Sequence, residues 1–243
     1  MFRNPGRITA AMLAGAVSLG AMSVAQAQDA QNDDWVDLES WDEESVYKGW
    51  SADEMLDEDV YGANGDEIGE VEDFMIGSDG KIARVVVEGG GFLDIGDSHV
   101  AIPYDRMKRN RSDSFTAPLT EEELEDGRVG MFETVDDMPA KPQNWRVSNL
   151  IGDSMLLENR VGYGLVDDVI FGNDGAIKSV IVRPSYGYGY GLGPRAVPYA
   201  NTFDPYQPYY STPYTLAELE ETERFNYGRL DEDNWEGEAF GEE

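Results

Sequence analysis

The strongest constraint on the fold is an internal repeat, because Trp50 recurs as Trp145 and the same spacing of 95 positions then holds without a gap. Other residues that recur at this spacing are Asn64 and Asn159, Val71 and Val166, Asp73 and Asp168, Gly80 and Gly175, Pro103 and Pro198, Thr120 and Thr215, and Leu124 and Leu219. A duplicated segment of roughly 75 residues predicts two domains with one fold, each near the lower size limit for an independent core.

The pattern within each repeat predicts strands. In the first copy, Asn64-Gly65 and Asp79-Gly80 are typical of tight hairpin turns. Between them, residues 68–76 do not alternate cleanly, and we interpret them as a strand with a bulge because Gly69 and Gly77 bracket them. Residues 82–87 form a β-branched run that is apolar on both faces, as expected where a sheet closes around a small core. Thr120 begins a short capped helix.

The N-terminus predicts export. Residues 1–27 combine Arg3 and Arg7 with an apolar run over 8–24 and the small-x-small site Ala25-Gln26-Ala27, as in a secretory signal peptide. Cleavage would leave Gln28 first and place the chain in the periplasm of a Gram-negative bacterium. No other segment is apolar enough to cross a membrane, so no span is expected after removal of the signal.

The remaining chain divides by composition. We expect an acidic arm over 28–49, a first domain over 50–127, a linker over 128–144, a second domain over 145–226 and an acidic tail over 227–243. Self-repulsion predicts an extended or disordered arm and tail, although Trp35 and Trp41 could pack on a domain. The predicted fold class is therefore mainly all-β: two small β-barrels in tandem, each with a short C-terminal helix, between disordered acidic ends.

Charge and residue usage exclude several functions. The 49 Asp and Glu against 18 Lys and Arg give a formal charge of −31, which disfavours nucleic-acid binding and favours solvation, divalent cations and basic proteins. Cysteine is absent, which excludes disulfides and thiolate sites. The single histidine, His99, has no evident orienting partner and is expected to have an ordinary loop role. No catalytic residue and no cofactor is predicted.

The order of motifs resembles the PRC-barrel family. It runs Gly-x-Val-x-Asp, Asp-Gly turn, β-branched strand, Gly-rich loop, Ala-Ile/Val-Pro-Tyr and a Thr-x-x-Glu-Leu helix. The residues that carry it are Gly69, Val71, Asp73, Asp79, Gly80 and Pro103 in the first copy, and Gly164, Val166, Asp168, Asp174, Gly175 and Pro198 in the second. The resemblance implies β-barrels used for protein contacts, and it brings no catalytic residues.

The acid pairs Glu72-Asp73 and Asp167-Asp168 recur at equivalent positions and could bind a cation. Adjacent strand residues point to opposite faces, however, so only one acid of each pair can serve a given site. Hard cations need several converging oxygens, and we therefore favour a capping role at the bulge or the following turn.

Two segments are candidate partner surfaces. A loop of the second copy alternates Tyr186, Tyr188 and Tyr190 with glycine; it could be a binding surface or a self-packed low-complexity loop. The other segment is the only basic cluster after the signal and consists of Arg106, Lys108, Arg109 and Arg111. Neutralising the chain's own acidic arm is favoured over binding an external anionic partner.

The leading hypothesis is a non-enzymatic periplasmic binding or scaffold protein that contacts another envelope protein through the tyrosine-rich loops of the second copy. The alternative is a low-affinity divalent-cation buffer acting through the acidic arm and tail, or an acidic envelope-stress protein. A hydrolase is disfavoured because neither repeat offers a nucleophile with a base beside it.

Overall fold

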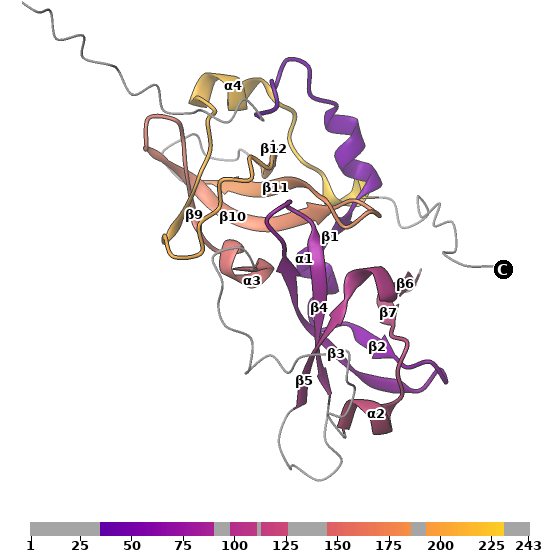
Figure 1. The fold of residues 1–243 in the computed structure, drawn as a ribbon. Helices are drawn as coiled ribbons and strands as arrows, with labels where there is room; N and C mark the ends of the chain where they lie inside the picture. The colour runs from indigo at the N-terminus through magenta and orange to yellow at the C-terminus, as the bar shows by residue number, and fades with distance from the viewer. Residues whose placement is uncertain (1–34, 90–97, 111–112, 126–144, 186–192, 231–243) are drawn as a thin grey trace, which may run out of the picture. The chain divides into compact units, whose positions relative to one another are not determined.

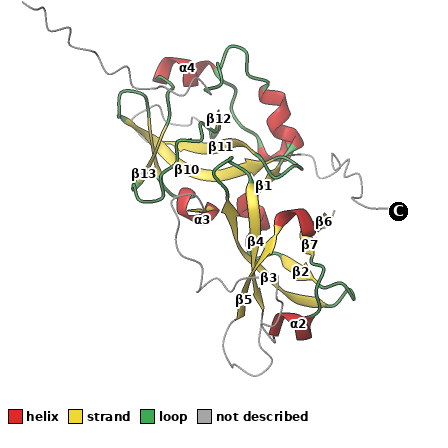
Figure 2. Cartoon of the chain, viewed as in Figure 1, coloured by secondary structure: helices red, strands yellow, loops and turns green. Residues whose placement is uncertain are grey.

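The computed structural model describes residues 35–89, 98–110, 113–125, 145–185 and 193–230 (Figure 1). These residues form two β-sheets with a few short helices (Figure 2), which confirms the prediction of a mainly β protein. Among the residues so described, no helix is long and apolar enough to span a membrane.

The first sheet is built from the first repeat. Its strands are β2 (Asp59–Tyr61), β3 (Glu67–Ile76), β4 (Ile82–Gly89), β5 (Ser98–Pro103), β6 (Lys108–Asn110) and β7 (Ser114–Thr116). They lie in the order β5-β4-β3-β2-β7-β6, with β7 parallel to β2 and the other neighbours antiparallel. The turn η2 (Tyr104–Arg106) precedes β6, and the helix α2 (Glu121–Glu125) follows the sheet.

The second sheet has the same topology. Its strands are β9 (Ser154–Leu156), β10 (Gly162–Phe171), β11 (Ile177–Pro184), β12 (Arg195–Pro198) and β13 (Tyr209–Ser211), and the helix α4 (Leu216–Glu221) follows them. The order β12-β11-β10-β9-β13 matches β5-β4-β3-β2-β7, and β13 again lies parallel to its neighbour. The repeat in the sequence is thus a repeat in the fold, except that β6 has no counterpart among the described residues of this sheet.

The turns and the bulge lie where the sequence predicts them. Gly65 and Gly80 have φ angles of 85° and 71°, which favour glycine in the hairpin turns that flank β3. The pairing of β3 with β4 shifts register between Val71 and Asp73, and the pairing of β10 with β11 shifts at the equivalent place. The bulge matters because it sets the direction of the Asp73 side chain.

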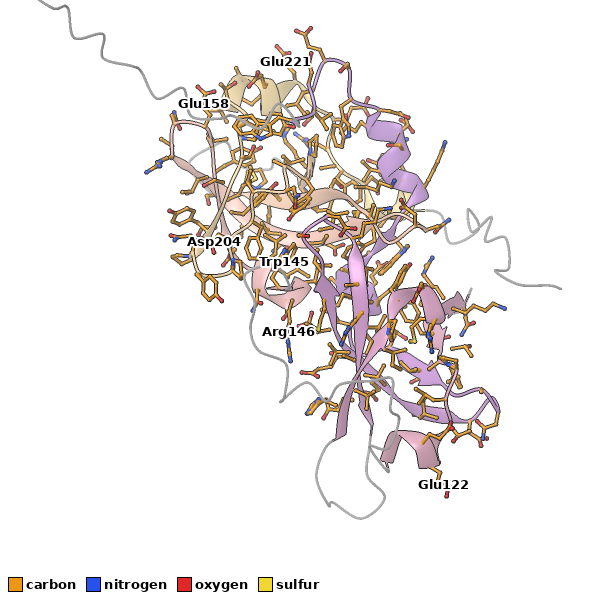
Figure 3. All side chains as sticks on the ribbon, in the orientation of Figure 1. Glu122, Trp145, Arg146, Glu158, Asp204 and Glu221 are labelled. Carbon is orange, nitrogen blue, oxygen red and sulfur yellow. The ribbon has the colours of Figure 1, made fainter. Side chains whose placement is uncertain are left out.

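The opening strand of each repeat pairs with the sheet of the other repeat. Strand β1 (Trp50–Ser51) is antiparallel to β10, with Trp50 opposite Phe171. Strand β8 (Trp145–Arg146) is antiparallel to β3, with Trp145 opposite Ile76. Figure 3 labels Trp145 and Arg146 just before the helix α3 (Val147–Leu150), which corresponds to α1 (Ala52–Met55) of the first repeat. This exchange is not predicted from the sequence.

The hairpin turns of the two repeats also meet. The backbone N–H of Ile82 donates to the Gly175 carbonyl at 2.9 Å, and that of Ile177 donates to the Gly80 carbonyl at 3.0 Å. One hydrophobic cluster includes buried residues of both sheets, among them Trp50. The two repeats therefore share a core as well as backbone hydrogen bonds.

Part of the acidic arm is folded, contrary to the expectation of an extended or disordered segment. The short helix η1 (Glu43–Lys48) buries Val46 and Tyr47 against the second sheet. The Tyr47 ring stacks on Phe225 with centroids 5.1 Å apart, and the Arg229 guanidinium lies 3.9 Å from the centre of the same ring. These contacts outweigh the self-repulsion of the acids.

The start of the predicted tail is also described, because η5 comprises Tyr227–Arg229. Trp41 packs beside η1, while Trp35 is 40% exposed. The predicted signal peptide, the linker over 128–144 and residues 231–243 lie outside the described residues. The domain boundaries remain predictions.

Candidate interaction site

The exchanged strands are held by a buried carboxylate in each sheet. Asp168, which follows the bulge in β10, is fully buried. The Ser51 hydroxyl donates to its Oδ2 at 2.6 Å, and the Asp53 backbone N–H donates to Oδ1 at 3.0 Å. Oδ1 also accepts the Val169 backbone N–H at 2.7 Å. Asp168 thus links the bulge of one repeat to the first turn of α1 from the other.

Asp73 makes the mirrored set of contacts in the first sheet. Its Oδ1 accepts the Phe74 backbone N–H at 2.8 Å and the Ser148 backbone N–H at 3.2 Å. The Ser148 hydroxyl donates to Oδ2. The prediction that these acids cap the bulge is confirmed, and each also caps a helix of the other repeat, which was not predicted.

Burial raises the pKa of both carboxyls. It raises the pKa of Asp168 to about 7, although hydrogen bonds from Ser51, Asp53 and Val169 act in the opposite direction. Burial also raises the pKa of Asp73, against hydrogen bonds from Ser148 and Phe74 and the charge of Arg146. The joint between the repeats therefore contains two acids whose pKa is raised by burial.

The neighbouring acids face other partners, as expected for adjacent strand residues. Glu72 accepts from Arg146 at 2.9 Å, and its second oxygen lies 2.7 Å from Nδ1 of His99. His99 was expected in a loop without a partner, but it lies in β5 and pairs with this acid. In the second repeat, Asp167 forms an ion pair with Arg183 instead.

The basic cluster lies around β6, at the end of the first sheet's strand order. Arg106 and Lys108 are exposed. Arg109 is more buried: its Nη2 lies 3.3 Å from Asp113 Oδ1, and its guanidinium lies 5.5 Å from the centre of the Trp50 ring. Burial lowers the pKa of Arg109, while the charge of Asp113 raises it. Arg109 thus connects the basic cluster to Trp50, the tryptophan of the exchanged strand β1.

A pocket of about 550 Å³ opens beside Arg109. It is lined by three segments: residues 49–55 with α1, the β6–β7 turn, and residues 227–230. Its lining includes the arginines Arg109 and Arg229 and the acids Glu54 and Asp113. The structure therefore places the basic cluster beside a hollow that carries charges of both signs.

Other predicted site residues cannot be placed. Tyr186, Tyr188, Tyr190 and Arg111 lie outside the described residues. Where the chain is described, no group of three or more acidic or histidine side chains converges as a metal site would require. The predicted weak binding of divalent cations was assigned mainly to the acidic ends, so it stays a prediction.

Comparison with known families identifies one segment of the chain. Residues 51–124 match the PRC-barrel domain. The match begins at Ser51, immediately after Trp50, and extends through β7 and almost all of α2. It indicates a protein-interaction module, and such domains are generally non-catalytic. No curated protein matches the chain.

The segment matched to the PRC-barrel domain contains Ser51 and α1, which contact the other repeat through Asp168. The sequence contains one signal for the exchange of opening strands, because Trp50 and Trp145 recur ahead of equivalent short helices. The repeat spacing alone does not say which sheet each tryptophan joins.

Proposed function

We propose that this chain is a non-enzymatic, exported binding protein whose tandem PRC-type repeats form one module that contacts another protein of the cell envelope. The PRC-barrel domain over 51–124 is the observation that carries the proposal, since it indicates protein interaction. The second sheet, with the same strand order, supports its assignment as a second PRC-type repeat. The signal-like residues 1–27 support export.

Two surfaces are proposed to make the contact. The loop that carries Tyr186, Tyr188 and Tyr190 offers amphipathic rings on a glycine-rich backbone, which suits a protein interface. The exposed side chains of Arg106 and Lys108 add positive charge to a chain with a net charge of −31. Charge of this kind mainly affects association rate and choice of partner.

Affinity capture from an envelope extract tests the proposal. We expect the full chain to retain a specific partner, and Tyr186, Tyr188 and Tyr190 changed together to Ser to reduce its recovery about tenfold or more, because the aromatic contact area is lost. Arg106→Gln with Lys108→Gln should weaken recovery less, and mainly at low salt.

The matched control is Tyr206→Ser, which removes an exposed tyrosine from a different loop and should leave recovery unchanged. Equal recovery by wild type and the triple tyrosine variant would contradict the assigned surface. A chain retained in the cytoplasm with residues 1–27 intact would contradict export.

A further inference from the structure

The turn between β2 and β3 has a close counterpart between β9 and β10, where Figure 3 labels Glu158. In the first turn the backbone N–H of Gly65 donates to the Gly62 carbonyl at 2.9 Å. In the second, the N–H of Arg160 donates to the Leu157 carbonyl at 2.8 Å. The φ angles of Gly65 and Arg160 are 85° and 62°. The two turns therefore share one backbone form, with glycine in one and arginine in the other.

The asparagine before this position is also held in the same way in both turns. The Asp66 backbone N–H donates to Asn64 Oδ1 at 3.4 Å, and the Val161 backbone N–H donates to Asn159 Oδ1 at 3.1 Å. Both asparagines are exposed. An asparagine that bonds to the backbone two residues on turns its side-chain amide toward the peptide nitrogen between them. Each turn thus places an amide carbon near a backbone nitrogen.

Only the first turn leaves that nitrogen unhindered. Asn64-Gly65 is the only Asn-Gly step in the sequence. A Cβ placed on Gly65 would meet no atom within 4 Å, so no neighbour restrains the backbone there. Glycine rotates at little cost, whereas the side chain of Arg160 restricts its own backbone and crowds its nitrogen. In both turns the N–H must first leave its carbonyl partner, so this opening step does not distinguish them.

We propose that Asn64 is a site of spontaneous deamidation and that Asn159 resists it. The Gly65 nitrogen attacks the Asn64 amide carbon and closes a succinimide ring. The bond from that carbon to Nδ2 breaks, and ammonia leaves with the proton that the Gly65 nitrogen gives up. Water then opens the ring at either carbonyl, which yields aspartate or isoaspartate. This inference does not depend on the partner binding proposed above.

The reaction changes the first turn in charge and in length. The Asn64 side-chain amide donates to Asp66 Oδ2 at 2.6 Å, and a carboxylate in its place would face Asp66 as a like charge. Isoaspartate also adds a methylene to the backbone, inside the loop that the Gly62 N–H closes on the Asp66 carbonyl at 2.7 Å. Deamidation should therefore loosen the hairpin of β2 and β3.

Peptide mass mapping of the full chain tests this assignment. The folded protein is incubated at pH 8 and then digested with trypsin, which releases residues 49–81 as a peptide with no other asparagine and no glutamine. We expect Asn64 to deamidate roughly tenfold or more faster than Asn159, because only Asn64 precedes glycine. The product should be two isomers of equal mass, aspartate and isoaspartate, which chromatography separates.

Two variants exchange the residues that distinguish the turns. Arg160→Gly should make Asn159 react as fast as Asn64, and Gly65→Arg should slow Asn64 to the rate of Asn159. Arg160→Lys is the matched control and should leave Asn159 slow. Equal rates at Asn64 and Asn159 in the wild type would overturn the proposal without any variant. Aspartate as the single product would also overturn it, because direct hydrolysis forms no ring.

Discussion

Trp50→Ala is expected to destabilise both repeats together, by about 3–5 kcal/mol. The indole is 3% exposed and packs against Phe74 of the first sheet, at 5.4 Å, and Phe171 of the second, at 5.0 Å between ring centroids. Its removal leaves a cavity in the core that the two sheets share. Since small proteins are stable by about 5–15 kcal/mol, much of the stability would be lost.

Urea denaturation followed by circular dichroism measures this effect. We expect one cooperative transition in the wild type and one transition at much lower urea in the variant. Trp35→Ala is the matched control, because this tryptophan is 40% exposed and its loss should change the free energy of unfolding by about 0.5 kcal/mol or less. Two separate transitions, with only one of them moved by Trp50→Ala, would show that the sheets unfold independently.

The buried Asp168 should make the protein more stable at mildly acidic pH. Its pKa in the folded state is about 7, against an ordinary value of 3.8. Between these values the folded state binds a proton that the unfolded state does not, so the free energy of unfolding rises as the pH falls. This contribution is lost as the pH rises through about 7. From pH 8 to pH 5 the expected gain from Asp168 is about 2–3 kcal/mol.

Asp168→Asn isolates this contribution, because the amide cannot titrate and its oxygen can still accept the backbone N–H groups of Asp53 and Val169. Urea midpoints at pH 5, 6.5 and 8 should show a smaller pH dependence than the wild type. The exposed control Asp66→Asn should keep the wild-type dependence. A wild-type protein more stable at pH 8 than at pH 5, or an unchanged dependence in Asp168→Asn, would contradict this reasoning.

The local structure of each repeat could be predicted from sequence because it depends on neighbouring residues. Gly65 and Gly80 mark turns that need positive φ angles, and the β-branched run of β4 fits a strand buried on both faces. The bulge before Asp73 could be predicted because the apolar residues there do not alternate. The capping role of Asp73 was favoured for a different reason, because a hard cation needs several converging oxygens.

The exchange between repeats could not be predicted in this way. A two-residue strand such as β1 has no periodicity, and its sequence suits the edge of either sheet equally, because the sheets share one pattern. The pairing of His99 with Glu72 depends on strand register, which the sequence does not specify. In the acidic arm, the excess of acids predicted an extended or disordered segment. The burial of Val46 and Tyr47 is nevertheless enough to hold η1 against the second sheet.

The exchange makes the two repeats of the proposed interaction module structurally dependent on each other. Each sheet contains a strand, a helix and a capping contact from the other repeat, so neither sheet is complete without its partner. A protein bound on one repeat would therefore meet a surface whose geometry the other repeat stabilises. The pocket at Trp50 lies at this joint, beside the exchanged strand β1.

Cleavage of the chain between the repeats measures this interdependence. A protease site placed within residues 128–144 would separate the covalent chain into two fragments without changing β1, β8 or the acids that hold them. We expect the cleaved fragments to elute together at the size of the intact protein and to separate only when denaturant unfolds them. Fragments that separate in native buffer, each retaining its own sheet, would contradict the exchange of strands between the repeats.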